Sequence, residues 1–122
     1  MAETYWITFC IADSGAEDRR YQALLATVRR ATSSIWWTES VNFLMFHSEQ
    51  DIDQIAGEVA AAFDPSTDLA LLSTLNGAQA RAIGAFEDPL LFELMPNAVR
   101  FHPEPAHAPR APSPSEPPSP PA

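Results

Sequence analysis

The order of the segments that the sequence predicts constrains this chain more than any single motif. Between Thr4 and Leu75, the pattern of apolar residues predicts a strand, a helix, two close strands, a second helix and a last strand. This order is typical of an α+β domain in which two helices cover one face of an antiparallel sheet. Such domains carry many unrelated activities, so the order predicts architecture and leaves function to particular residues.

The first strand and the first helix have clear signals. Tyr5–Ala12 is mostly aromatic or β-branched, which predicts a central strand with both faces largely covered. Ser14 and Glu17 form a capping-box pattern that predicts the start of a helix. The helix has apolar residues at the spacing of a face that packs on a core, namely Tyr21, Leu24, Leu25 and Val28.

Two short strands and a second helix are predicted next. The strands are Ile35–Trp37 and Val41–Phe46, with a turn or bulge at Thr38–Ser40, and a single bent strand is the alternative. Ser48 is the candidate cap of the helix, which ends at Asp64 because a residue before proline disfavours the helical region. The apolar stripe of this helix consists of Ile52, Ile55, Ala56, Val59 and Phe63.

The segments after the second helix are less regular. Leu69–Leu75 is the last strand of the pattern, and Asn76-Gly77 is a turn dipeptide. Ala78–Ile83 fits either a fifth strand at the sheet edge or a short helix, and the sequence leaves both open. Asp88-Pro89 begins a short helical turn that Pro96 ends.

Proline divides the chain into a domain and a tail. Nine of the 12 prolines lie from Pro103 onward, interleaved with Ala and Ser. A segment of this composition buries little apolar surface, which predicts a disordered or polyproline II-like tail. We therefore expect a folded domain over residues 1–101 and a tail over residues 102–122. A domain of about 100 residues buries only about two-thirds of its unfolded surface, which favours oligomer formation.

The charge composition argues against some partners. The formal net charge is −9 at pH 7, and all seven basic residues are arginine. Binding to nucleic acid is disfavoured, because neutralisation of phosphates by basic side chains drives such binding. No apolar segment approaches the length of a membrane span, and the N-terminal residues lack the pattern of a signal peptide. We therefore expect a cytoplasmic protein that does not bind membranes.

One stretch of the chain resembles a known family. Trp36–Leu44 combines an aromatic pair, a Glu-Ser step and an apolar strand, and the helix start Asp51–Ile55 and the strand and turn Asp68–Gly77 follow it. In these residues and their spacing, Tyr5–Gly84 resembles the SinR-like small proteins, which are related to the CRISPR-associated adaptation subunit. The resemblance implies a ferredoxin-like βαββαβ fold with two helices on one face of an antiparallel sheet. It also implies a mobile-element or defence-related protein that acts as a dimeric scaffold or as a metal-dependent nuclease.

The resemblance implies where such a nuclease would hold its metal. The ligand is an Asp at the end of the first strand of each subunit, and Cys10 occupies that position here. A neutral thiol is a poor ligand for Mg²⁺, which prefers oxygen. Asp13 is the candidate replacement, and its alternative role is to cap the first helix. Cys10 lies in an apolar strand, so we expect a buried thiol that packs as a small hydrophobe.

Arginines of the first helix form a candidate anion site. Arg19 and Arg30 are eleven residues apart, which places them on one helix face three turns apart. With Arg20 they give a candidate stripe for nucleic acid or another anion. The alternative is a solvated helix face whose arginines pair with the many acidic residues.

Adjacent tryptophans give a candidate interface. Trp36 and Trp37 point to opposite faces of a strand, so one packs under the helices while the other lies on the open sheet face. Exposed aromatic patches mark interfaces, which predicts a dimer surface. Packing within the core is one alternative. Base stacking is another, although these strands lack interleaved basic residues.

The residues therefore predict a binding module more than an enzyme. The sequence contains no paired-carboxylate, Ser-His-Asp, Walker or dinucleotide-binding pattern. We expect a non-catalytic scaffold that forms a homodimer through its sheet, binds a protein partner and needs no cofactor. The alternative is the metal-dependent nuclease, which would need Mg²⁺. A small-molecule sensor is a third possibility, for which the chain offers no convergent polar set.

Overall fold

The computed structural model describes residues 2–12, 17–40 and 42–102, and within them the chain forms a six-stranded sheet and three helices. The fold class is α+β, and the first six elements follow the predicted order. The elements are β1 (Glu3–Cys10), α1 (Glu17–Ala31), β2 (Thr32–Ser40), β3 (Phe43–Ser48), α2 (Ile52–Ala62), β4 (Leu69–Thr74), β5 (Ala80–Gly84), α3 (Leu90–Leu94) and β6 (Ala98–Phe101).

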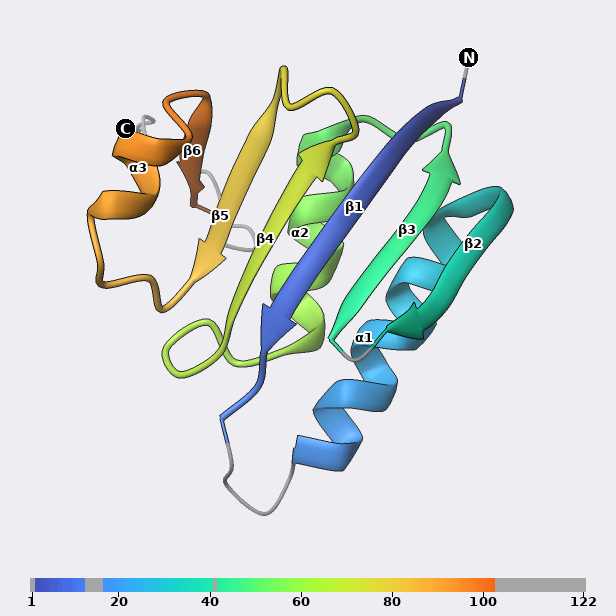
Figure 1. Cartoon of the computed structure of the whole chain (residues 1–122). Coiled ribbons are helices and arrows are strands. Elements are labelled where there is room, and N and C mark those ends of the chain that lie inside the picture. The colour runs from blue at the N-terminus through green and yellow to red at the C-terminus, as the bar shows by residue number, and fades with distance from the viewer. Residues whose placement is uncertain (1, 13–16, 41, 103–122) are drawn as a thin grey trace, which may run out of the picture.

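The sheet is mixed, although the sequence predicts an antiparallel one. Its strand order is β2-β3-β1-β4-β5-β6, and all neighbours pair antiparallel except β5 and β6, which are parallel. β1 pairs with β3 and β4, which confirms that it is a central strand, but only one of its two faces is buried, whereas the sequence predicts that both are largely covered. Figure 1 shows α1 and α2 together behind the sheet, so that the opposite face of β1, β3 and β4 has no helix over it.

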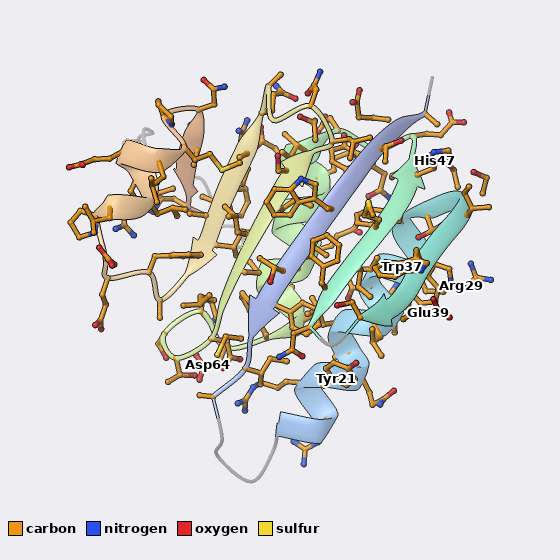
Figure 2. The ribbon with its side chains drawn as sticks, in the orientation of Figure 1. Tyr21, Arg29, Trp37, Glu39, His47 and Asp64 are labelled. Atoms are coloured by element: carbon orange, nitrogen blue, oxygen red, sulfur yellow. The ribbon has the colours of Figure 1, made fainter. Side chains whose placement is uncertain are left out.

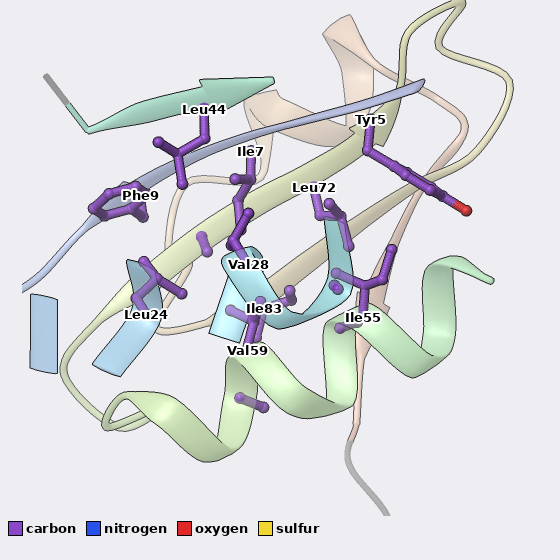
Figure 3. Packing of buried hydrophobic residues seen from close by; sticks show 14 of the residues in the cluster. Tyr5, Ile7, Phe9, Leu24, Val28, Leu44, Ile55, Val59, Leu72 and Ile83 are labelled. Carbon is purple, nitrogen blue, oxygen red and sulfur yellow. The ribbon is translucent and has the colours of Figure 1, made fainter. Parts of the chain in front are cut away.

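The core lies between the sheet and the two long helices (Figure 3). Side chains of β1 alternate, so that Tyr5, Ile7 and Phe9 are buried against the helices. The predicted apolar stripes of both helices pack in this core. Leu24 and Val28 of α1 are fully buried, and the buried residues of the α2 segment are Ile52, Ile55, Ala56, Val59, Ala60 and Phe63.

Two local predictions around β2 and α2 are corrected. Of the turn or bulge predicted at Thr38–Ser40, only the bulge agrees with the structure, because these residues belong to β2 and its register against β3 shifts between Trp37 and Ser40. The turn comes later, with Asn42 at φ 57°, and β3 begins at Phe43. Asparagine tolerates this left-handed conformation because its short polar side chain bonds locally. The cap of α2 is Asp51 instead of Ser48, because Asp51 and Gln54 form a capping box. The capping pattern at Ser14 lies outside the described residues.

The C-terminal third contains a strand that the sequence analysis missed. The sequence of Ala78–Ile83 fits either a strand or a helix, and the structure forms β5 at Ala80–Gly84. β5 is not the edge of the sheet, because β6 pairs alongside it. The predicted helical turn is α3, which contacts β6. β6 has only four residues, so its sequence has too few positions to show a strand pattern.

Gly84 occupies a position that a side chain would disrupt. Its φ is 98°, and a Cβ atom there would lie 2.2 Å from the backbone oxygen of Asp68. Gly77 also has a positive φ, 75°, but an added Cβ would meet no atom within 4 Å. The two glycines therefore separate the cost of the backbone conformation from the cost of a steric clash.

We expect Gly84→Ala to destabilise the fold much more than Gly77→Ala. The left-handed conformation alone costs an alanine about 1 kcal/mol at Gly77. At Gly84 the clash adds to this cost, for a total of about 3 kcal/mol or more. Urea unfolding followed by circular dichroism measures both values. Equal losses of unfolding free energy at the two positions would contradict the expected clash at Gly84 and would show that β4 and β5 move apart there at little cost.

Candidate functional site

The open side of the sheet carries a group of large apolar side chains. Trp6 of β1 lies directly across from Met45 of β3, which lies across from Trp37 of β2. These residues alternate with the buried ones, so they point away from the helices. Together with Phe43 they form a surface that we call the aromatic face. Trp37 is 42% exposed, and the other three are half-buried.

The rings of the aromatic face contact one another. The centroids of Trp6 and Phe43 are 6.0 Å apart with an interplanar angle of 26°, and those of Trp37 and Phe43 are 6.3 Å apart at 70°. Both distances lie in the range in which aromatic pairs attract each other. The indole N–H of Trp37 donates a hydrogen bond to Oε1 of Glu39 at 3.2 Å, and Figure 2 shows both side chains on β2. The face is therefore an ordered surface that remains open to solvent.

A mostly apolar pocket of about 370 Å³ adjoins this face. It opens where the register of β2 shifts against β3 before Trp36. Its lining residues are Thr4, Ile35, Trp36, Trp37, Met45, Phe46 and His47. Ile35 is 64% exposed, although isoleucine is usually buried. The pocket and the aromatic face together form a continuous apolar surface on this part of the sheet.

Trp36 has the opposite orientation, as the sequence predicts. It packs against the hydrophobic core, and Cζ of Arg29 lies 5.4 Å from the centroid of its ring. This cation–π contact fixes the edge strand β2 to α1. Of the two candidate interface residues, only Trp37 therefore offers its ring to a partner on the open face.

The arginines predicted as an anion stripe have different environments. Arg20 is tied to the core by an ion pair with Asp68, in which Nε and Oδ2 are 2.8 Å apart. Arg19 and Arg30 are exposed, and Nη2 of Arg30 lies 3.4 Å from Oγ1 of Thr27. An anion site on this helix therefore stays a prediction for Arg19 and Arg30, while Arg20 already has a carboxylate partner.

Asp68 connects four segments of the chain. Its Oδ1 accepts a hydrogen bond from the backbone N–H of Ala12 at 2.7 Å, and its Oδ2 accepts one from the N–H of Asp64 at 2.9 Å. Arg20 also donates from Nη2 to the backbone oxygen of Ala12 at 2.7 Å. The backbone oxygen of Asp68 accepts from the N–H of Ala85. The carboxylate therefore ties the end of β1, α1 and the loop before β4 together, and the backbone oxygen of the same residue adds the end of β5.

Cys10 is exposed, which corrects the expectation of a buried thiol. It is the last residue of β1, beyond the point at which β1 pairs with β3, so only β4 flanks it. Asp13, the candidate metal ligand, lies outside the described residues. Among the described residues, no group of three or more His, Cys, Asp or Glu side chains could hold a metal ion.

A second pocket, of about 730 Å³, lies between α2 and β6, and the sequence analysis missed it because it missed β6. Arg81 and Asp53 form an ion pair there with Nε and Oδ1 2.7 Å apart, and Val99, Phe101 and His102 line the other side. The only signal in the sequence was an apolar residue on each side of Arg100. The pocket combines an ion pair that is already formed, a few apolar side chains and Arg100, which lies over the ring of Phe92.

Comparisons with known proteins give no relatives. No protein-family model, curated protein or solved structure matches the chain. The resemblance to SinR-like proteins therefore stays a prediction. In the part of the chain that the structure describes, none of the helices is both long and apolar enough to cross a membrane.

Two Arg–Asp pairs of similar length allow a test of burial. Asp68 is completely buried, whereas the side chain of Asp53 is 61% exposed. We expect Asp68→Ala to cost about 3–5 kcal/mol of unfolding free energy, because it leaves Arg20 and two amide groups without their partner. Asp53→Ala should cost less than about 1 kcal/mol. Chemical denaturation of both variants measures this difference, and equal losses would contradict a central role for Asp68.

The carboxylate of Asp64 allows a test by titration. Hydrogen bonds from the hydroxyl and the backbone N–H of Ser66, at 2.7 and 3.0 Å, lower the pKa of Asp64 below its ordinary value. Because the folded state holds the lower pKa, ionised Asp64 favours folding above its ordinary pKa, and this contribution is lost as the pH falls through the lowered value. We expect Ser66→Ala to raise the pKa of Asp64, measured by carbon NMR of the carboxyl group. Ser33→Ala is the control and should leave the pKa unchanged.

Proposed function

We propose that this chain is a non-catalytic binding module that forms a homodimer through the aromatic face. The observation that supports the proposal is the uncovered group of Trp6, Trp37 and Phe43 on the side of the sheet without long helices. The largest exposed apolar patch on a protein of this kind is often a functional surface, and exposed aromatic patches mark interaction sites. Tryptophan is also enriched among the residues that contribute most to binding energy.

The size of the face indicates how strong the dimer is. The face lies on three strands, which at about 4.8 Å spacing and about 20 Å length cover roughly 300 Å² in projection per copy. A stable interface buries about 800 Å² per partner. We therefore expect a weak dimer that forms in a concentration-dependent way, and a binding surface that a further protein partner can use.

We further propose that β1 to β4, with α1 and α2, form a ferredoxin-like core to which β5, α3 and β6 are added. The order β2-β3-β1-β4 with antiparallel pairing and two helices on one face supports this proposal. A relationship to SinR-like proteins, and with it a role in a mobile element or in defence, is part of the same proposal and rests on the residues from Trp36 to Gly77. We also propose a cytoplasmic location, which rests on the sequence alone.

Truncation of Trp37 tests the interface. We expect Trp37→Ala to weaken the dimer by at least about 2 kcal/mol, or about thirtyfold in Kd, because a central tryptophan contributes this much at interfaces. The substitution removes an exposed ring, so the fold should persist by circular dichroism. Analytical ultracentrifugation over a range of concentrations measures the dissociation constant.

Leu94→Ala is the matched control for this test. Leu94 is 86% exposed but lies on α3, away from the aromatic face. Its loss should leave the dissociation constant unchanged. A wild-type chain that sediments as a monomer at every concentration would refute dimer formation, and an equal effect of both substitutions would place the interface elsewhere.

A further inference from the structure

The aromatic face lacks positive charge, which favours an uncharged ligand over a phosphate. Four arginines of the described residues make other contacts: Arg20 with Asp68, Arg81 with Asp53, Arg29 over Trp36 and Arg100 over Phe92. The charged side chain that contacts the face is Glu39, through the indole of Trp37. Nucleic acids that stack on aromatic sheet faces need basic residues beside the rings. The face is therefore better suited to a neutral, apolar chain.

We propose that residues 103–122, the proline-rich tail, bind the aromatic face of their own chain as a polyproline II segment. This inference rests on the proposed function only in using the same face as a binding surface, and it does not require a dimer. Because the tail and a second copy of the chain would occupy the same rings, the tail would limit access to the interface.

The chemistry of the two partners matches. Proline-rich segments dock in aromatic-lined grooves, where the proline rings pack on the faces of aromatic side chains. Little conformational entropy is lost, because proline already restricts the free segment to this extended form. Six of the last eleven residues, from Pro112 to Ala122, are proline. The pocket of about 370 Å³ beside Trp37 offers apolar walls from Ile35 and Met45 for such rings.

The tail starts close enough to reach this face. β5 and β6 are parallel, and β5 runs antiparallel to β4 as β4 does to β1, so β6 runs in the same direction as β1. The chain therefore leaves β6 at the end of the sheet at which β1 ends. From β6 to β2 there are five strand spacings, or about 24 Å. Twenty residues of polyproline II extend about 62 Å, so the tail can cross the sheet and lie along the face.

Because the tail is attached to the same chain, even a weak contact is sufficient for it to occupy the aromatic face. A flexible connection gives a tethered segment an effective concentration of the order of mM. A contact with a dissociation constant near mM would therefore occupy the face for about half of the time. Charge also favours one orientation, because Arg110 is the single cation of fixed charge in the tail and Glu39 is exposed beside Trp37. This pairing would place the segment after Pro112 on the rings.

Paramagnetic relaxation in the full-length chain tests the proposal. Cys10→Ser removes the native thiol, Ser115→Cys introduces a new one, and a nitroxide label on it broadens the amide signals of nearby residues. We expect the signals of Trp6, Trp37 and Phe43 to lose more than half of their intensity relative to the reduced label. The signal of Glu58, exposed on α2 in the helix layer, should be unchanged. Equal intensities at all four residues would overturn the proposal.

Two variants and one mixed sample make the result specific. Replacement of Pro117, Pro118, Pro120 and Pro121 by Ala, and separately Trp37→Ala, should each restore most of the lost intensity, whereas Leu94→Ala should not. Broadening that survives the proline replacements would overturn the polyproline mode. Broadening only when isotope-labelled chain is mixed with spin-labelled chain would show binding of another copy's tail and overturn binding within one chain.

Sedimentation of the same samples separates this inference from the dimer. Broadening in a monomer supports binding of the tail without a dimer, and a dimer without broadening refutes binding of the tail.

Discussion

The buried carboxylate of Asp68 is the interaction on which the arrangement of the sheet ends depends. Backbone hydrogen bonds hold neighbouring strands together, but they do not fix where β1 ends relative to α1 and to the loop before β4. Asp68 does this with Arg20 and the amides of Ala12 and Asp64. Because the carboxylate is buried away from water, the loss of any of its partners would destabilise the fold strongly. Gly84 belongs to the same arrangement, because only a residue without a side chain lets β5 pass so near the backbone of Asp68.

The two sides of the sheet have different physical roles. The helix side is a closed core in which Ile7, Leu24 and Ile55 are fully buried, and its packing stabilises the fold without any contact to a partner. The open side presents aromatic rings that contact each other and remain in water, so its apolar surface is available for binding. Trp36 and Trp37, adjacent in sequence, divide between these two roles. The formal net charge of −9 makes copies of the chain repel one another, which disfavours association away from apolar surface.

Local signals explain what the sequence predicts well. The stripes in α1 and α2 predict both helices and their buried faces, and the alternation between Trp36 and Trp37 predicts that one ring packs under the helices while the other lies on the open face. Other features depend on contacts between distant residues. β6 has four residues and forms only because β5 provides a partner, so no local pattern marks it. Asp68 follows a loop and looks like a solvated acid, and only the folded chain brings Arg20, 48 residues away, against it. Cys10 looks buried in an apolar run because the run continues past the point where β3 stops covering it.

The span of the Asp68 contacts has a consequence for the kinetics of the fold. Arg20 and Ala12 lie 48 and 56 positions before Asp68, so closing these bonds costs the entropy of a long loop, and we expect them to form late in folding. Interactions that form late on the folding pathway affect the unfolding rate much more than the folding rate. The Asp68 contacts would therefore slow unfolding and lengthen the lifetime of the native state. The folding rate would depend instead on the helices and the central strands.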